Sequence, residues 1–388
     1  MNIPIAKTVF QQAELDAILE PLRSGWIVQG PFVKEFEQKW CSFTGAPFAI
    51  ATSNCTTALH LSLSALGIGP GDEVIVPAFT WVASANAIES LGARPVFSDI
   101  ELGSFNINLD LAQQAFTSRT KALMPVHLFG LSVDMDRVLQ LAEANHVFIV
   151  EDAACGFASR YKGMHVGTFG ATGCFSFHPR KAITTGEGGM ITTSNEQLAA
   201  KLRAMRDHGA TTSDHQRHLG PRPYLLPEFP YLGYNYRMTD IQASIGSTQM
   251  DRAAEVAALR SRWARRYDES LAPASWLRVP RYGNDYVHGY QAYVCLFSPV
   301  EITTANVLSV HERRNRFMDY LQSNGVSTRP GTNAVHMLGY YREKYRLTAE
   351  QFPNSWIADH CSIAFPLFPT MTEKEFDHIT SLIKRFDP

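Results

Sequence analysis

The sequence predicts an α/β fold in two parts: a large domain on a mainly parallel sheet, and a smaller C-terminal α+β domain. Short apolar runs that suit buried strands alternate with helical segments in the first part of the chain. This alternation is typical of a parallel sheet covered by helices. An Arg- and Ala-rich helical segment, 251–268, then precedes the remainder. With 388 residues the chain is long enough for two domains, and we expect their ranges to be 1–250 and 251–388.

The composition argues against several classes of protein. The formal net charge is −2, so the chain lacks the basic footprint of a nucleic-acid-binding protein. No apolar run approaches the length of a membrane span. The N-terminal residues MNIPIAKTVFQQ lack the basic and apolar regions of a signal peptide. We therefore expect a cytoplasmic protein that binds neither nucleic acid nor membrane.

The six cysteines are scattered along the chain, and no two of them form a CxxC pair. This spacing argues against a disulfide framework and against a zinc site, and it fits a reducing compartment. We therefore expect no metal site. The cysteines are Cys41, Cys55, Cys155, Cys174, Cys295 and Cys361.

The elements expected up to residue 100 alternate between helices and strands. They are a helix at 13–22, a loop SGWIVQGP, a helix at 33–45, a strand at 46–52, a helix at 53–66, and the strands EVIVP and RPVFSDI with a helix between them. Ser53 or Asn54 is placed to cap the helix at 53–66. The free N–H groups and positive dipole at such a helix start suit a phosphate group.

The next elements carry the residues that point to chemistry. A strand from residue 120, a turn at Gly130 and a helix lead to an apolar run, Val147–Val150, that reads as a buried strand. The run ends in Glu151 and Asp152. A second strand is expected at Gly173–Phe177, before Lys181 and a Thr/Gly-rich turn.

The remainder reads as a long loop, a linking helix and a smaller domain. We expect a loop at 202–232, a helix entered from 233 and capped by Thr239 or Asp240, the linking helix 251–268, strand character at 286–298, and a helix at 311–325. A strand and a helix close the chain, with Thr372 and Glu375 spaced as a T-x-x-E capping box.

Asp152 and Lys181 suggest two opposite charges around one bound molecule. Lysine is a poor nucleophile at its ordinary pKa, and burial or a nearby cation activates it for Schiff-base chemistry. A pyridoxal phosphate (PLP) site needs such a lysine, together with an Asp that keeps the pyridine nitrogen protonated. A solvated surface lysine would explain Lys181 alone, but it would not explain the Asp and the glycine-rich turn beside it.

The stretches EDAACGF and FSFHPRKAITTGEGGM resemble the Asp and Lys motifs of the PLP-dependent sugar aminotransferases of the DegT/DnrJ/EryC1/StrS family. The resemblance extends over nearly the whole chain, from SGWIVQGP to FPLFPTMT. It implies an aspartate-aminotransferase-like fold (PLP fold type I) with a seven-stranded sheet in the large domain. It also implies a homodimer whose two active sites are shared between subunits.

The resemblance also implies roles for individual residues. Lys181 would hold the cofactor covalently, Asp152 would face the ring nitrogen, and Trp81 would stack on the ring. The phosphate would be held by Ser176 and by the backbone near Thr56 and Thr57, with Asn235 contributed by the other subunit. The alternatives are purely structural roles, namely a Trp in the core at position 81 and an Asn in a turn at position 235.

Two cysteines depart from the family pattern. Cys55 stands where the family often has glycine, which puts close backbone approach to the phosphate in doubt. Cys155 stands where the family usually has a polar residue that bonds the cofactor's phenolic oxygen, and a thiol is a weak donor.

Substrate contacts are expected from three further residues. Trp26 lies in the N-terminal segment that the family places near the active site, although a packed loop Trp explains it equally well. Arg329 has the planar fork that suits a carboxylate or phosphate. His336 is the third, with a satisfied structural histidine as the alternative.

The function implied is amino transfer from L-glutamate to a keto-sugar, in amino-sugar biosynthesis. The expected acceptor is a nucleotide-linked 4-keto-6-deoxy sugar or a 3-keto sugar. One alternative is a PLP-binding regulatory homologue without turnover, and another is a PLP sugar dehydratase, which carries His in place of Lys181. An amino-acid transaminase stays open too, because Arg329 could bind a substrate carboxylate.

Overall fold

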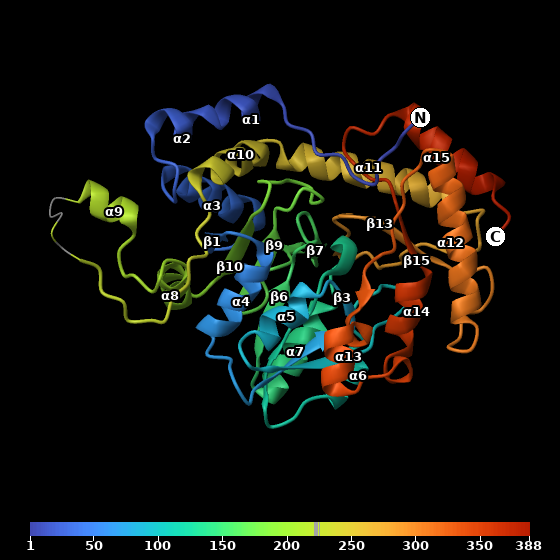
Figure 1. The fold of residues 1–388 in the computed structure, drawn as a ribbon, viewed down its shortest axis with the longest axis horizontal. Helices are drawn as coiled ribbons and strands as arrows, with labels where there is room; N and C mark the ends of the chain where they lie inside the picture. The colour runs from blue at the N-terminus through green and yellow to red at the C-terminus, as the bar shows by residue number, and fades with distance from the viewer. Residues whose placement is uncertain (221–223, 225) are drawn as a thin grey trace.

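The structure, a computed structural model, describes residues 1–220, 224 and 226–388 (Figure 1). Its centre is a seven-stranded sheet with the order β1-β10-β9-β6-β5-β2-β4. Only β10 runs antiparallel to its neighbours, so the expected mainly parallel sheet is confirmed. The strands are β1 (Phe48–Thr52), β2 (Glu73–Pro77), β4 (Arg94–Ser98), β5 (Thr120–Leu123), β6 (Phe148–Asp152), β9 (Thr172–Ser176) and β10 (Gly189–Thr193).

Helices cover both faces of this sheet, and strand β2 shows why. All five of its residues are buried; Val74 and Val76 enter one hydrophobic cluster while Ile75 enters another. Successive side chains of a strand point to opposite faces, so a continuous apolar strand needs cover on each side. The covering helices are α3 (Pro31–Thr44), α4 (Cys55–Ala65), α5 (Ala83–Glu89), α6 (Leu109–Gln114), α7 (Met135–Asn145), α8 (Glu196–Arg206) and α10 (Asp240–Met250).

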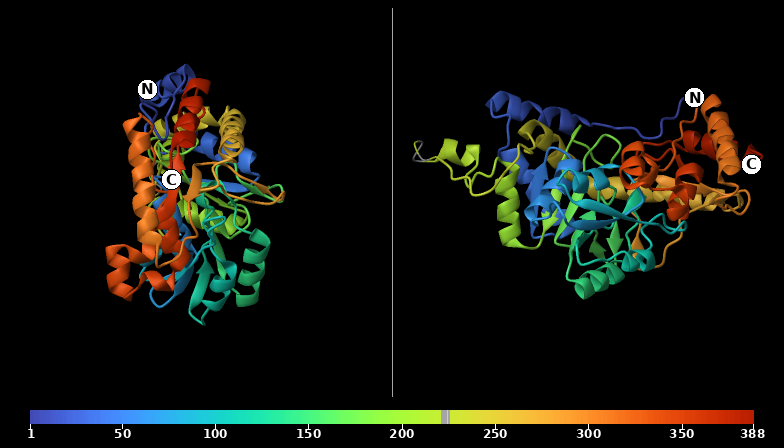
Figure 2. Two further views of the ribbon diagram at one scale, coloured as in Figure 1. Left: turned by 90° about the vertical axis from the view of Figure 1, so that its right-hand side faces the viewer. Right: turned by 60° about the horizontal axis from the view of Figure 1, so that its bottom comes forward.

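The C-terminal part has its own antiparallel sheet in the order β11-β13-β15. Ile3, near the N-terminus, pairs with Val326 and shares the core of this part, and the first residues lie beside the C-terminal helices in Figures 1 and 2. The division at residue 250 stays a prediction. The elements are β11 (Leu277–Arg278), β13 (Tyr293–Phe297), β15 (Ser362–Phe365), α11 (Ala253–Leu271), α12 (Val307–Ser323), α14 (Pro353–Cys361) and α15 (Glu373–Arg385).

A short strand pair ties the C-terminal part to the large sheet. Strand β14 (Asn333–Ala334) pairs with β3 (Phe79–Thr80), and the Val335 N–H donates to the Ala78 carbonyl at 2.7 Å. This contact fixes the segment that directly precedes Trp81. The other short elements are β7 (Arg160–Tyr161), β8 (Met164–His165), β12 (Tyr286–Val287), α13 (Gly339–Tyr345), η1 (Leu128–Gly130), η2 (Val335–Met337) and η3 (Ala349–Gln351).

The single helix expected at 13–22 is wrong, because two helices occupy this stretch. They are α1 (Gln12–Ala17) and α2 (Leu19–Ser24), with a break at Ile18. Pro21 explains the break: it has no N–H for the Ala17 carbonyl, and its ring clashes with that carbonyl in a straight helix.

The loop expected at 202–232 is also wrong over two stretches. Helix α8 continues to Arg206 because Leu202 and Met205 bury a face of it. Helix α9 (Asp214–Leu219) begins at Ser213, which forms a reciprocal capping box with Gln216. Residues 221–223 and 225 of the expected loop lie outside the described residues.

Helix starts that the sequence marked with caps are confirmed. Asn54, rather than Ser53, caps α4; Thr239 caps α10; Thr372 and Glu375 form the capping box of α15. None of the helices in the described part of the chain is long and apolar enough to cross a membrane.

Candidate active site

The carboxyl ends of several strands of the large sheet meet at one edge. Thr52 at the end of β1 pairs with Gly189, and Gly189 pairs with Ser176 at the end of β9. Asp152 at the end of β6 pairs with Cys174, two residues before Ser176. Ligands of open α/β sheets bind beyond the carboxyl ends of the strands, so this edge is the candidate site.

Lys181 extends from the loop after β9 back toward the end of β6. Its Nζ lies 3.3 Å from the Cys155 Sγ, three residues beyond Asp152. Lys181, Cys155 and Ser176 line one small cavity together with Ala154. The structure therefore brings together four of the positions that the two sequence motifs singled out: Asp152, Cys155, Ser176 and Lys181.

Asp152 is a buried carboxylate held by uncharged donors. Its side chain is 5% exposed. The Ser84 hydroxyl donates to Oδ2 at 2.7 Å, and the Ala154 N–H donates to Oδ1 at 3.1 Å. Because neither donor is a cation, the carboxylate keeps its attraction for a positive group in the site. A protonated pyridine nitrogen is such a group, so Asp152 fits the ring of PLP.

Glu151, the neighbouring acid, is fully buried and does a different job. It accepts from the N–H groups of Gly167, Phe169 and Gly170 and from His127 Nε2 at 2.9 Å. The Val133 N–H donates to His127 Nδ1, which therefore carries no proton, so Nε2 is the protonated nitrogen. These bonds hold Glu151 in place, and they thereby fix the end of β6 that carries Asp152.

The start of α4 lies over the same edge, next to Ser176. Thr57 is used within the cap: its N–H donates to Asn54 Oδ1 at 2.9 Å and its hydroxyl to the Asn54 carbonyl at 2.8 Å. Thr56 is exposed. A Cβ at Gly189 would lie 2.4 Å from the Asn54 carbonyl oxygen, so glycine is required for β10 to pass this helix start. For the phosphate we therefore favour Thr56 over Thr57.

Cys55, which replaces the glycine of the family pattern, faces inward and is buried. Burial, reinforced by the charge of Asp152, raises the pKa of its thiol well above the ordinary value. The side chain is therefore a neutral packing group, and only its backbone is available to a phosphate.

Trp81 presents an exposed aromatic ring near the start of α5. Its side chain is 63% exposed, although it lies only three residues before Ser84, which bonds Asp152. A large exposed ring is available for stacking on a planar ligand. The alternative, a Trp packed in the core, is wrong because this side chain is exposed.

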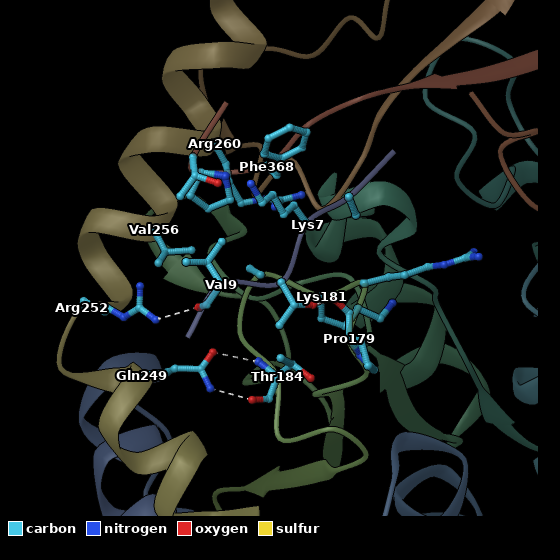
Figure 3. A pocket seen from close by; sticks show the side chains of 16 residues that line it. Lys7, Val9, Pro179, Lys181, Thr184, Gln249, Arg252, Val256, Arg260 and Phe368 are labelled. Atoms are coloured by element: carbon cyan, nitrogen blue, oxygen red, sulfur yellow. Dashed lines mark hydrogen bonds between the residues drawn. The ribbon is translucent and has the colours of Figure 1, made fainter. Parts of the chain in front are cut away.

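A second cavity on the other side of Lys181 is positively charged (Figure 3). The N-terminal segment, helix α11 and the loop at Phe368 enclose it, and no acidic side chain is among its described lining residues. Arg252 bonds the Val9 carbonyl and forms an ion pair with the buried Glu14 at 2.7 Å, which offsets its charge. Gln249 makes two bonds to the Thr184 backbone. Burial lowers the pKa of Arg260 to about 10. The basic residues in its wall are Lys7, Arg180, Lys181, Arg252 and Arg260.

Three other expected site residues lie on separate segments of the subunit. Trp26 packs against His215 and His218 of α9, with ring centroids 5.1 and 5.2 Å apart. Asn235 is exposed and its backbone pairs with Asp207. Arg329 is exposed and its backbone pairs with Ala364. Their expected roles stay predictions.

His336 is fully buried and packs against Phe352, with ring centroids 4.7 Å apart. Neither ring nitrogen makes a hydrogen bond of ordinary geometry to the described residues. Burial lowers the pKa of the imidazole to about 4. A substrate has no exposed atom of this side chain to contact, so we now propose a packing role for His336.

This histidine should make the protein sensitive to acid. Its pKa is lower in the folded protein than the ordinary value near 6.5, so the unfolded chain binds more protons as the pH falls from 6.5 toward 4. The contribution of His336 to the free energy of unfolding is fully present above pH 6.5. It should be lost as the pH falls toward 4, by up to about 1.4 kcal/mol per pH unit. Chemical denaturation of wild type and His336→Phe at pH 7, 6 and 5 measures this. A smaller loss in the variant is expected, and equal losses would contradict the assignment.

All six cysteines are free, and no cluster of metal-ligating side chains occurs in the described ranges. Sequence reasoning missed two partners of the site: Ser84 and the His127–Glu151 pair. A signal for each was present. Ser84 is a polar residue at the start of an Ala-rich helix, and Glu151 is a second acid in an otherwise apolar strand.

The geometry agrees with comparisons to known proteins. The model of the DegT/DnrJ/EryC1/StrS aminotransferase family matches residues 9–384. MJ1066, an uncharacterised protein of Methanocaldococcus jannaschii, is 34% identical over 384 residues, which cover 99% of this chain and 97% of that protein.

Two solved structures extend the similarity to the whole fold. Spr1654 from Streptococcus pneumoniae, a proposed sugar aminotransferase, was determined in its PLP form. It superimposes with a TM-score of 0.90 at 29% identity, over 99% of this chain and 98% of that chain. The aminotransferase from Psychrobacter cryohalolentis has a TM-score of 0.87 at 31% identity, over 97% and 96% of the two chains.

Proposed function

Because the chain belongs to the DegT/DnrJ/EryC1/StrS aminotransferase family, we propose that it moves the amino group of L-glutamate to a keto-sugar. The acceptor we favour is a nucleotide-linked 4-keto-6-deoxy or 3-keto sugar, in amino-sugar biosynthesis. The family and its PLP-form structures establish an aminotransferase that uses PLP. The sugar itself is the proposal, and the similarity to Spr1654, a proposed sugar aminotransferase, supports it.

The observation that carries the proposal is that Lys181 reaches back to the strand end that carries Asp152. The Lys181 Nζ reaches Cys155 at 3.3 Å, next to the strand end where the Asp152 carboxylate is buried. PLP, when bound, supplies a carbonyl group for the lysine and a ring that accepts electrons. Opposite charges placed at the two ends of such a ring are what this chemistry needs.

In the proposed reaction each residue has a separate task. Lys181 Nζ would hold PLP and would act as the acid–base group that moves a proton at the substrate carbon. Asp152 keeps a proton on the ring nitrogen, so that negative charge that develops in the transition state is stabilised. Trp81 would cover one face of the ring. Ser176 and the backbone at Thr56 would hold the phosphate.

The positive wall beside Lys181 supports L-glutamate as the amino donor. Glutamate carries two carboxylates. Arg252 in this wall is paired with Glu14, but Lys7, Arg180 and Arg260 form no ion pair with a described acid, so the cavity attracts anions. Arg329 stays a proposed contact for the acceptor, with Trp26. An intact Lys181 argues against the dehydratase, because those enzymes carry His at this position.

The test is a transfer assay with a panel of nucleotide-linked keto-sugars and L-glutamate. We expect an amino-sugar product, detected by mass spectrometry, from at least one member, together with 2-oxoglutarate in equal amount. If 2-oxoglutarate forms only when 2-keto acids are the acceptors, the proposal of a keto-sugar acceptor is overturned. That result would favour an amino-acid transaminase. Neither product would favour the regulatory homologue.

We also propose a homodimer in which Asn235 reaches the cofactor phosphate of the partner. Large apolar side chains are exposed on α1, α2 and the following loop, and again around residue 230, on the same side of the molecule (Figure 1). Exposed apolar surface of this kind marks protein–protein contact. Sedimentation should give twice the chain mass, and a monomer would contradict the shared site. The residues are Leu15, Leu19, Leu22, Ile27, Val28, Leu226, Phe229 and Leu232.

A further inference from the structure

A chain of buried hydroxyl groups leads to the Asp152 carboxylate. The Thr80 Oγ1 lies 3.1 Å from the Ser84 Oγ, and the Ser84 Oγ lies 2.7 Å from the Asp152 Oδ2. The exposed fractions of Thr80, Ser84 and Asp152 are 1%, 0% and 5%. Water therefore has little access to any of the three groups, and each depends on the others for its hydrogen bonds.

The directions of these hydrogen bonds follow from the chemistry of the groups. An ionised carboxylate only accepts, and a serine hydroxyl has one hydrogen to donate. The Ser84 hydrogen therefore goes to Asp152, since the competing Trp81 carbonyl is farther away at 3.2 Å. The Ser84 oxygen is then free to accept, and Thr80 donates to it. Bonds in such a chain polarise and strengthen one another.

We propose that Ser84 is a positioning residue that keeps Asp152 ionised and aimed at the ring nitrogen of PLP, with Thr80 orienting Ser84. This inference rests on the role proposed above for Asp152. Burial disfavours the charged form of a carboxylate, and a donated hydrogen bond favours it. Ser84 supplies one of the two donors of Asp152, beside the Ala154 N–H. Without Ser84, the carboxylate would lose one of its two donors and the contact that orients it, so it would stabilise a protonated ring nitrogen less well.

The hydroxyl chain begins at a fixed point of the fold. Thr80 belongs to β3, whose backbone pairs with Asn333 of β14. The pairing holds the Thr80 backbone in place at the contact between the C-terminal part and the large sheet. Ser84 lies on the first turn of α5, four residues after Thr80. The hydroxyl chain therefore connects the Asp152 side chain to β3 and α5. The orientation of the Asp152 carboxylate depends on these two elements.

The test compares Ser84→Ala with Ser84→Thr, which keeps the hydroxyl, and with Ser62→Ala as a matched control. Ser62 is equally buried, but its hydroxyl faces the Cys174 sulfur at 3.3 Å. Two quantities are measured on the full-length proteins: the dissociation constant of PLP, and the nitrogen-15 chemical shift of bound PLP labelled at the ring nitrogen. The second reports protonation of that nitrogen, which a general loss of packing does not change.

For Ser84→Ala we expect PLP binding to weaken about ten-fold or more, the scale for a hydrogen bond to a charged group. The nitrogen-15 shift should move toward that of unprotonated pyridine. Ser84→Thr and Ser62→Ala should stay near wild type in both quantities. A wild-type nitrogen-15 shift in Ser84→Ala would overturn the inference, as would an equal change in Ser62→Ala.

A second variant covers the case in which Ser84→Ala does not fold. Thr80→Val keeps Ser84 and removes its donor, so it should shift both quantities in the same direction by a smaller amount; no shift would also overturn the inference. If the wild type converts glutamate but the Ser84 variants keep the wild-type PLP affinity and nitrogen-15 shift, the inference about Ser84 is overturned. The proposed function would then still stand. A wild type that binds PLP without responding to glutamate would instead count against the function.

Discussion

Replacing Lys181 with alanine is expected to reduce the rate of amino transfer by at least about 10⁴-fold. A positioned acid–base group alone contributes about 10²- to 10⁴-fold, and this variant also loses the covalent attachment of the cofactor. The side chain is half-buried, with Cys155 as its hydrogen-bond partner, so its removal should leave the fold intact. Single-turnover kinetics with L-glutamate and saturating PLP measure the effect.

Lys162→Ala is the matched control, because it removes a lysine from an exposed ion pair with Asp136. Surface pairs of this type contribute little to stability, so the control should keep the wild-type rate. A Lys181→Ala protein that transaminated at near the wild-type rate would refute the assignment of this lysine.

Replacing Asp152 with asparagine is expected to slow the glutamate half-reaction by about 10²- to 10³-fold, the scale for removing a preorganised electrostatic stabiliser. Asparagine has nearly the same shape but no charge. It cannot keep the ring nitrogen protonated, and its amide has only one acceptor oxygen for the two donors, the Ser84 hydroxyl and the Ala154 N–H. PLP binding should weaken as well.

Asp136→Asn, from the same surface pair as Lys162, serves as the control for this carboxylate. Stopped-flow absorbance after mixing with L-glutamate gives the rate of each protein. If Asp152→Asn reacted as fast as Asp136→Asn, the ring nitrogen would have to be held by some other group.

The sequence was sufficient to predict the large sheet, because its strands are short, apolar and regularly alternated with helices. Strand β2 is buried on both faces, and such strands have the least ambiguous pattern. The errors came from local signals that were present but not used. Pro21 divides the first helix, and the Ser213–Gln216 capping box starts α9 inside a stretch read as loop.

The centre of the site could also be predicted, because Asp152, Ser176 and Lys181 lie within one continuous stretch of sequence. The structure adds what sequence spacing could not supply. Ser84 reaches Asp152 across 68 residues of chain, and His336 turns out to be buried against Phe352. Such contacts depend on how the elements pack. In the proposed dimer, Asn235 would act in the site of a second subunit, which the structure of one chain does not describe.

The most direct test of the central claim is the absorption spectrum of the purified, PLP-loaded protein before and after addition of L-glutamate. We expect a visible band from the lysine-bound cofactor that bleaches when glutamate is added and returns when 2-oxoglutarate is added. That result would demonstrate the cofactor, its attachment to lysine and the first half of the reaction in one experiment. A visible band that stays unchanged with glutamate would contradict glutamate-dependent amino transfer at this site.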